Sequence, residues 1–323
     1  MNQAVKKNNI YFHQHSPASA DMMKEIHQGL SKKQKSISPK YFYNEKGSQL
    51  FDSITQLPEY YPTRTEVGLL KAHASEFAEL MGKDSILLEL GSGSSIKIRL
   101  LLEALKPKIY VPMDISEEHL IRSAERLAKD YPWLEIHATC VDYSKPWQVP
   151  DFGPGRYNAF FPGSSIGNFE PADAQKLLTQ IAKLVGKQGG LLIGVDLKKD
   201  SNTLESAYND KQGVTAEFNL NLLHHLNEQR DVDFDTSQFE HKALYNLDKG
   251  RIEMHLVSKE NQEVQIEDKT YHFDVGETIH TENSYKYSPD EFHALAHKAG
   301  FSPEKVWIDE KNLFSIHYLK VFE

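Results

Sequence analysis

Apolar and polar positions form two kinds of segment across the middle of the chain. Between residues 85 and 197, short apolar runs are separated by longer amphipathic stretches. Strands that alternate with helices in this way are typical of a doubly wound parallel sheet. The expected strands, each with the turn that follows it, lie at 85–95, 109–116, 134–143, 157–169 and 189–197.

The segments before this region are expected to hold three helices. They lie at Met22–Leu30, at Ser48–Thr55 and from Pro62 to about Met81. In the third helix, Thr63 is expected to be the N-cap, because Glu66 follows it at the spacing of a capping box. Residues 1 to 19 are polar and are expected to form a loose tail.

The alternation stops after Asp200 and resumes only near the end of the chain. Two helices, then two or three strands, and finally a helix and a hairpin are expected, at 201–208, 215–228, 241–247, 251–259, 264–276, 289–299 and 304–322. This order predicts an α/β domain that is interrupted by an α+β insertion. The expected domains are 64–198 plus 286–323, and 20–63 plus 199–285.

Composition narrows the functional class. The chain has 323 residues, 37 basic and 46 acidic side chains and a formal net charge of −9, which disfavours a general nucleic-acid binder. A single cysteine, Cys140, allows no internal disulfide and indicates a reducing compartment. No apolar window approaches the length of a membrane span. We expect a cytoplasmic monomer that acts on a small molecule, without nucleic acid or membrane.

A glycine turn follows the first expected strand. Gly91 and Gly93 allow a ligand to approach the backbone closely, whereas Ile96 stands where a dinucleotide motif has its third glycine. Asp114 ends the second strand, where a carboxylate accepts ribose hydroxyls, and Asp142 ends the third, where it can accept an adenine amine. The set favours S-adenosylmethionine over NAD. Taken singly, each acidic residue is equally well explained as an ordinary strand-end cap.

A second turn of small residues, FPGSSIGNF (161–169), follows the fourth strand. A substrate commonly faces the cofactor at this edge of an open α/β sheet. The backbone of Gly163 and the amide of Asn168 suit an amine. The competing interpretation is a purely structural turn.

The fifteen histidines do not indicate a metal site. His293 and His297 have helical i, i+4 spacing, but the chain has no HExxH sequence and no cysteine cluster. A solvated helix face explains the pair better, and we expect no metal.

Several longer segments resemble the histidine Nα-methyltransferases of ergothioneine biosynthesis. They are YFYNEKGSQLFDSITQLPEYYPTR, LELGSGSSIKIRLLLEAL, GSSIGNF, AYNDKQGVTAEFNLNLL, DFDTSQFEH, RIEM and TENSYKYS. The resemblance extends from about residue 20 to the end of the chain. It implies a Rossmann-like methyltransferase domain with an inserted α+β substrate-binding domain. The implied reaction transfers three methyl groups from S-adenosylmethionine to the α-amine of L-histidine and gives hercynine.

The resemblance also implies roles for individual residues. Those implied to bind the cofactor are Gly91, Lys97, Asp114, Asp142 and Tyr143. Those implied to orient the amine, and so to be catalytic, are Tyr43, Tyr60 and Asn168, and Gly163 also binds the substrate.

The rest of the implied substrate site lies in the insertion. Tyr208 matches a carboxylate-binding tyrosine, and Met254 lies beside the substrate side chain. Glu282 and Ser284 match a pair that holds the imidazole, and their spacing puts both on one face of a strand. From the residues alone, a solvent-facing edge strand is an equally good interpretation of that segment.

The chain departs from the family pattern near these positions. Pro162, Ser165, Tyr285 and Tyr287 replace the residues that are usual there, which puts the shape of the pocket in doubt. Relatives that methylate tryptophan-derived amines offer an alternative within the family, although an indole would give Glu282 little to hold. A NAD-dependent oxidoreductase and a non-catalytic amino-acid-binding module are the alternatives outside it.

Overall fold

The computed structural model describes residues 5–7, 9–15, 19–93, 95–143, 145, 147–229 and 231–322. The chain divides into two compact units. The first comprises Met1–Ser16, Pro62–Lys198 and Lys286–Glu323, and the second comprises Pro17–Tyr61 and Lys199–Tyr285. Each unit has its own sheet.

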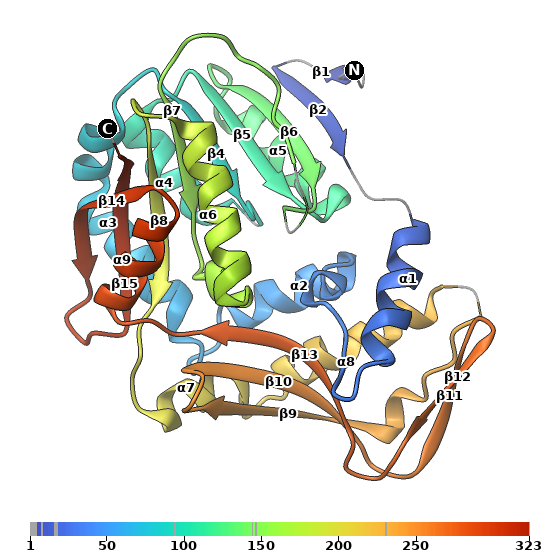
Figure 1. The fold of residues 1–323 in the computed structure, drawn as a ribbon. Helices are drawn as coiled ribbons and strands as arrows, with labels where there is room; N and C mark the ends of the chain where they lie inside the picture. Colours follow the sequence, from blue (N-terminus) through green and yellow to red (C-terminus); the bar gives the residue numbers. More distant parts are fainter. Residues whose placement is uncertain are drawn as a thin grey trace. The chain divides into compact units, whose positions relative to one another are not determined.

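The first unit is built on a nine-stranded sheet in the order β1-β2-β6-β5-β4-β7-β8-β15-β14 (Figure 1). The strands from β2 to β8 run parallel, and β1, β15 and β14 are antiparallel to their neighbours. Their bounds are β1 Val5–Lys7, β2 Ile10–His15, β4 Ile86–Leu90, β5 Ile109–Asp114, β6 Glu135–Val141, β7 Tyr157–Phe161, β8 Gly190–Asp196, β14 Phe301–Ile308 and β15 Phe314–Val321. The predicted doubly wound α/β sheet is confirmed.

The central strands β4, β5, β7 and β8 are buried almost throughout. Parallel strands that are covered on both faces read as continuous apolar runs rather than alternating ones, which is why the sequence shows them clearly. The strand order reverses between β4 and β7. Ligands of open α/β sheets bind beyond the carboxyl ends of the strands at such a reversal.

Helices cover both faces of this sheet (Figure 1). Three of them, α3, α4 and α5, share one hydrophobic core with the strands, whereas α6 and α9 contact each other on the other face. Their bounds are α3 Tyr61–Met81, α4 Ile96–Leu105, α5 Glu117–Asp130, α6 Pro171–Val185 and α9 Pro289–Lys298.

The expected loose tail is wrong for the described residues of β2. This strand pairs in parallel with β6, and Ile10 is only 3% exposed. Tyr11 stacks on His137 with ring centroids 4.4 Å apart, and His13 Nε2 lies 2.9 Å from His137 Nδ1. The strand covers what would otherwise be an open edge at β6, and so short a segment does not by itself reveal this distant partner.

The start of α3 also differs from the prediction. The helix begins at Tyr61, so Thr63 lies inside its first turn and is not the N-cap. The carboxylate of Glu66 is not part of a capping box, because it accepts hydrogen bonds from the distant backbone N–H of Gly163. A long-range partner has displaced the local one that the spacing suggested.

The second unit packs helices against a small mixed sheet of order β3-β13-β10-β9. A separate hairpin is formed by β11 and β12. The elements of this unit are α1 Ser19–Leu30, β3 Lys35–Ser36, α2 Glu45–Ile54, α7 Ser201–Tyr208, α8 Val214–Asn227, β9 Phe239–Asn246, β10 Arg251–Ser258, β11 Gln262–Ile266, β12 Lys269–Phe273 and β13 Thr278–Tyr285. Short 3-10 turns lie at Pro39–Phe42 and Thr236–Gln238.

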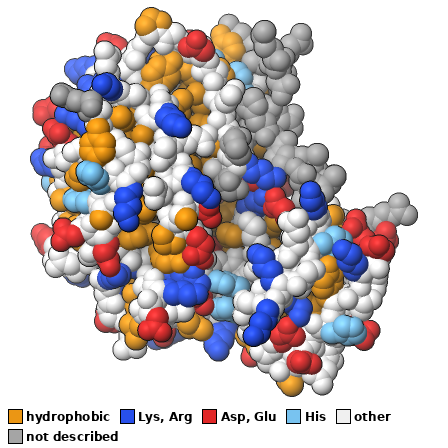
Figure 2. All heavy atoms as spheres, in the orientation of Figure 1, with side chains coloured by type: hydrophobic (Ala, Val, Ile, Leu, Met, Phe, Trp, Pro, Cys, Tyr) orange, Lys and Arg blue, Asp and Glu red, His pale blue; other side chains and the backbone are white. Residues whose placement is uncertain are grey.

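The surface mixes charges of both signs, and Figure 2 shows Lys and Arg side chains interspersed with Asp and Glu on the face drawn. Across the described residues, no helix combines the length and the apolar character that a membrane crossing needs.

A buried histidine in β15 predicts acid sensitivity. Burial lowers the pKa of His317 from 6.5 to about 3, and its ring bonds to Ser315 and to His293, which was expected on a solvated helix face. Because the folded state holds the ring neutral, its stabilising effect is present above pH 6.5 and is lost as the pH falls towards 3. Each pH unit in that window costs about 1.4 kcal/mol, so the free energy of unfolding should fall by roughly 2–3 kcal/mol by about pH 4.5.

Urea unfolding of the wild type and of His317→Gln across this range measures the effect. The variant should show a shallower dependence of its unfolding free energy on pH, whereas His272→Gln, at an exposed histidine, should keep the wild-type slope. Parallel pH curves for the wild type and His317→Gln would rule out this origin of the acid sensitivity.

Candidate functional site

The turn after β4 is held in a conformation that requires glycine. Gly91 and Gly93 have φ values of 68° and 47°. The N–H of Gly91 donates to the carbonyl of Met113 at 2.8 Å, and the Ser123 hydroxyl donates to the carbonyl of Gly93 at 2.9 Å. A Cβ added at Gly91 would lie 3.2 Å from the Tyr143 hydroxyl, so the backbone approaches that side chain closely. The turn is therefore a narrow cradle at the carboxyl edge of the sheet.

Asp114 ties this turn to the end of β5. Its Oδ2 accepts the Gly93 N–H at 3.0 Å, and its Oδ1 accepts the Ser116 N–H at 3.0 Å. A carboxylate has about four acceptor positions, so two remain for a ligand. Asp114 is thus fixed in place and still able to accept the two hydroxyls of a ribose.

Asp142 and Tyr143 follow β6. Asp142 is buried, and the ring of Tyr143 lies near Phe161 and Phe169 with centroids 6.0 and 6.3 Å apart. Burial raises the pKa of the Tyr143 hydroxyl, and the nearby Asp114 and Asp142 raise it further, so the group remains a neutral donor. An aromatic wall beside a carboxylate suits a purine.

A protonated acid lies beneath this turn. Burial raises the pKa of Glu89, in β4, to about 8, although a hydrogen bond from the Tyr110 hydroxyl lowers it in part. At neutral pH most of this side chain is uncharged, so it adds little negative charge beneath Asp114.

Lys97 and Gly163 meet at the carboxylate of Glu66. Lys97 Nζ lies 2.6 Å from Glu66 Oε2, and the Gly163 N–H donates to both carboxylate oxygens at 3.0 Å. Sequence reasoning identified Lys97 and Gly163 but assigned Glu66 to a helix cap. No local pattern signals this contact, since 97 positions separate Glu66 from Gly163.

The turn after β7 presents Asn168. Gly163 and Ser164 both have left-handed backbone conformations, with φ of 80° and 57°, and a short 3-10 turn at Ser165–Asn168 follows. The Ser164 hydroxyl accepts the N–H of Asp196 from β8 at 2.8 Å. The amide of Asn168 is half-buried at the carboxyl edge of the sheet, where it can contact a ligand.

The second unit collects the other predicted residues. The Tyr208 hydroxyl donates to Ser284 Oγ at 2.8 Å, and the rings of Tyr208 and Tyr60 meet edge to face with centroids 6.2 Å apart. Tyr60, Tyr208 and Ser284 are all buried. Segments more than two hundred residues apart in sequence therefore form one polar and aromatic group.

Glu282 and Met254 complete this group. They are direct partners across the antiparallel pair of β13 and β10, so their side chains share one face. Glu282 is 9% exposed and Met254 is 1% exposed. Glu282 and Ser284, two residues apart on β13, also share that face, which argues against the alternative of a solvent-facing strand.

Phe51 is a residue that sequence reasoning missed. Its ring lies 6.0 Å from that of Tyr43 and 6.3 Å from that of Tyr60, and Phe218 of α8 also packs against it at 6.0 Å. Phe51 therefore joins the two tyrosines that the sequence treated separately. Its place three residues before the end of α2, on the buried side, was the available signal.

Tyr61 is engaged differently from Tyr60. Lys199 Nζ donates to the Tyr61 hydroxyl at 2.6 Å and lies 4.5 Å from the ring centroid. Tyr61 is thus held by a cation at the junction of α3 and the segment before α7.

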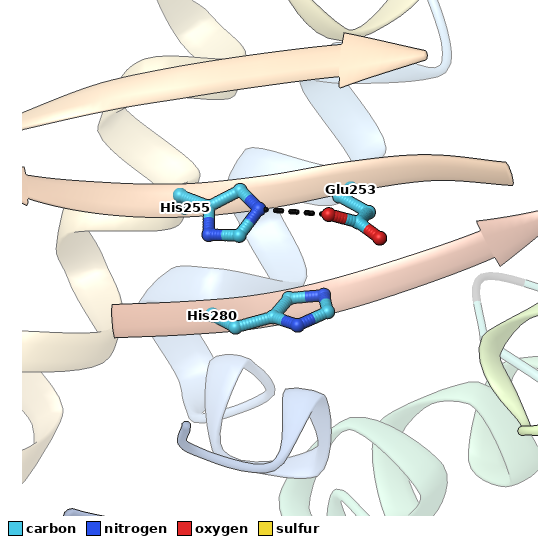
Figure 3. A group of neighbouring side chains, drawn as sticks. All are labelled: Glu253, His255 and His280. Atoms are coloured by element: carbon cyan, nitrogen blue, oxygen red, sulfur yellow. Dashed lines mark hydrogen bonds and ion pairs between the residues drawn. The ribbon is translucent and has the colours of Figure 1, made fainter. Parts of the chain in front are cut away.

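A further polar group lies on β10 and β13. Figure 3 shows Glu253 and His255 joined by a hydrogen bond, with His280 beside them. The two imidazoles stack with centroids 4.6 Å apart, and burial lowers the pKa of both. Two guanidinium nitrogens of Arg251 lie 2.6 and 2.8 Å from Glu253 Oε1. Although burial raises the pKa of Glu253, this contact brings it down to about 2. Two histidines and a carboxylate suit a transition metal, but the guanidinium already neutralises this carboxylate and opposes a second cation.

The amino-acid sequence matches one family model and several known proteins over most of its length. A model described as histidine-specific methyltransferase, SAM-dependent, matches residues 22–321. The histidine N-alpha-methyltransferase of Mycobacterium tuberculosis is 40% identical over 301 residues, which are 91% of this chain and 93% of that protein. That of Mycolicibacterium smegmatis is 38% identical over 306 residues, or 93% and 94% of the two chains. Ergothioneine biosynthesis protein 1 of Neurospora crassa is 33% identical over 298 residues, covering 86% of this chain and 32% of the fungal protein.

Proposed function

Because the chain belongs to the SAM-dependent, histidine-specific methyltransferases, we propose that it trimethylates the α-amino group of L-histidine to give hercynine, the first step of ergothioneine biosynthesis. The observation that carries the proposal is the pairing of Tyr208 with Ser284 on the face of the second sheet that also holds Glu282. A carboxylate and a hydroxyl together bind the ring N–H groups of an imidazole.

The first unit is proposed to bind the methyl donor. Asp114 retains two free acceptor positions for a ribose, and Asp142 beside Tyr143 suits an adenine. Gly91 and Lys97 would contact the remainder of the molecule. S-adenosylmethionine, when bound, supplies a methyl group that is activated by its sulfonium charge.

The amine is proposed to be oriented by Tyr43, Tyr60, Asn168 and the backbone of Gly163. Its lone pair must be free, so an ammonium has to lose a proton before each transfer. In-line displacement depends on alignment, which can contribute roughly 7–11 kcal/mol to lowering the barrier. Tyrosine ring faces also favour the positive charge that grows on the nitrogen. The displacement thus depends more on positioning than on acid–base power, and we propose that no metal takes part.

The rest of the substrate is assigned to the second unit. Tyr208 would bind the carboxylate, and Met254 would pack beside the side chain. Glu282 and Ser284 would fix the imidazole. A ligand without ring N–H groups would forgo the hydrogen bond to this buried carboxylate, and a hydrogen bond to a charged group contributes about 1.5–3 kcal/mol.

The two adjacent tyrosines are predicted to differ in function. Tyr60→Phe should raise the KM for histidine about tenfold, the effect of one lost hydrogen bond of about 1.4 kcal/mol. Tyr61→Phe should leave that KM nearly unchanged and lower the melting temperature, because its hydroxyl bonds Lys199. Steady-state kinetics and thermal unfolding of both variants test this, and a histidine KM that responds only to Tyr61→Phe would reverse the assignment.

The function is tested by mass spectrometry of an incubation with the twenty amino acids and S-adenosylmethionine. The expected result is a gain of three methyl groups on histidine alone. Absence of methylated histidine would refute the proposal, and methylation of another amine would favour a relative with altered specificity. We further propose that the chain works in the cytoplasm as a monomer without nucleic acid, which size-exclusion chromatography with light scattering tests for the oligomeric state.

A further inference from the structure

Glu66 is a buried acidic residue to which the proposed chemistry gives no role. It lies in the second turn of α3 and is 0% exposed. A carboxylate removed from water in this way is costly unless charges and hydrogen bonds compensate it. The groups that donate to the Glu66 carboxylate therefore show which parts of the structure it holds in place.

Three elements of the first unit converge on the carboxylate that α3 presents. The Gly163 N–H after β7 donates to both oxygens, and Lys97 of α4 lies 2.6 Å from Oε2. In β8, a Cβ added at Gly194 would lie only 2.1 Å from Oε1, so that glycine leaves the space that the carboxylate fills. Glu66 therefore connects the helix of the cofactor turn with the turn that ends in Asn168.

The turn that Glu66 holds needs such support. Gly163 and Ser164 are consecutive left-handed residues, and for a non-glycine residue this conformation costs of order 1–3 kcal/mol. Strain of this kind persists where surrounding contacts over-determine it. Glu66 fixes the turn at Gly163, and the backbone of Asp196 fixes it at Ser164.

We propose that Glu66 is a positioning residue that sets the Gly163–Asn168 turn against helix α4 and thereby aligns the amine with the methyl donor. Lys97 pairs with Glu66 in this arrangement, in addition to the cofactor contact assigned to it. The inference rests on the proposed function, because it concerns the alignment that methyl transfer requires. Its consequence is a defect in kcat rather than in binding.

Glu66→Gln tests the proposal with little change in shape. The amide oxygen can still accept one hydrogen bond, but the charge that holds Lys97 is gone. We expect kcat for the first methylation to fall by at least tenfold, while the histidine KM and the dissociation constant of S-adenosylhomocysteine stay within about threefold. Glu76→Gln, at a carboxylate on the same helix that contacts Lys305 and Trp307, should leave all three unchanged.

Lys97→Met is the second test variant, and together with Glu66→Gln and the double variant it forms a double-mutant cycle. It should lower kcat at saturating cosubstrates by at least tenfold, and the double variant should be no slower than Lys97→Met alone. If Glu66→Gln does not fold, Glu66→Asp, which keeps the charge on a shorter side chain, takes its place in the cycle with the same expected loss of kcat. A folded Glu66→Gln with kcat within twofold of wild type, additive losses in the cycle, or a defect confined to S-adenosylhomocysteine affinity would overturn the proposal.

The same assays separate this inference from the proposed function. If the wild type fails to methylate histidine, the proposed function is wrong. If the wild type methylates histidine and both variants match it, only the role of Glu66 is wrong.

Discussion

Replacing Glu282 with alanine is expected to raise the KM for histidine by roughly 10- to 150-fold, because a hydrogen bond to a charged group contributes about 1.5–3 kcal/mol. Glu282 is nine-tenths buried on β13, on the same face as Ser284 and its partner Met254. Its loss removes the acceptor for the imidazole. The affinity for S-adenosylhomocysteine should stay close to the wild-type value, because the proposed donor site lies in the other unit. Steady-state kinetics and calorimetry measure the two effects.

Two further variants sharpen this experiment. Glu282→Gln keeps the shape and one acceptor but removes the charge, so a smaller loss than in Glu282→Ala would isolate the hydrogen bond from the charge. Glu263→Ala is the control, since that carboxylate is exposed on β11 and pairs with His272 at 3.0 Å. A histidine KM that is unchanged in Glu282→Ala, or a matching loss in the control, would contradict the assignment.

The fold was predictable where local pattern and tertiary environment agree. Strands β4, β5, β7 and β8 are covered on both faces, so their apolar runs stand out, and the glycines after β4 mark the turn that follows. The helices between them repeat apolar positions along one face. In each case the residues that produce the strand, turn or helix are also the residues that make it recognisable in the sequence.

The features that the sequence did not reveal depend on partners far along the chain. Strand β2 is short, and what orders it is an edge of the sheet 124 residues away, where His13 meets His137. Glu66 lies at the spacing of a capping box, but its carboxylate instead binds the backbone N–H of Gly163 and the side chain of Lys97. The spacing of residues along the chain identifies only nearby hydrogen-bond partners, so it could not reveal these distant ones.

The candidate site likewise has a part that local sequence pattern predicts and a part that it does not. The glycines and Asp114 follow from the pattern of strand ends, because parallel strands bring their carboxyl ends to one edge. The residues of the second unit were reached only through resemblance to a family. The bond from Tyr208 to Ser284 and the ring contacts of Phe51 join segments with no shared periodicity, so no local rule predicts them.

Asp114→Asn is expected to weaken the binding of S-adenosylhomocysteine by at least about 60-fold, nearly as much as Asp114→Ala. Both oxygens of Asp114 accept backbone N–H groups, from Gly93 and from Ser116. An asparagine has only one oxygen, so its amide N–H must face one of these donors. The unpaired donor costs about 1–3 kcal/mol, and a weakened ribose contact adds about 1.5–3 kcal/mol. Because 1.4 kcal/mol is a factor of ten, the sum of roughly 2.5–6 kcal/mol corresponds to at least about 60-fold.

Calorimetry with S-adenosylhomocysteine measures this loss directly, and kinetics at saturating histidine show it as a raised KM for S-adenosylmethionine. Asp130→Asn serves as the control, because that carboxylate pairs with Arg99 at 2.7 Å at the exposed end of α5. If Asp114→Asn binds the product as the wild type does while Asp114→Ala does not, the two backbone bonds do not constrain the carboxylate. If neither variant loses affinity, Asp114 does not bind the ribose and the donor must be held by other residues of the first unit.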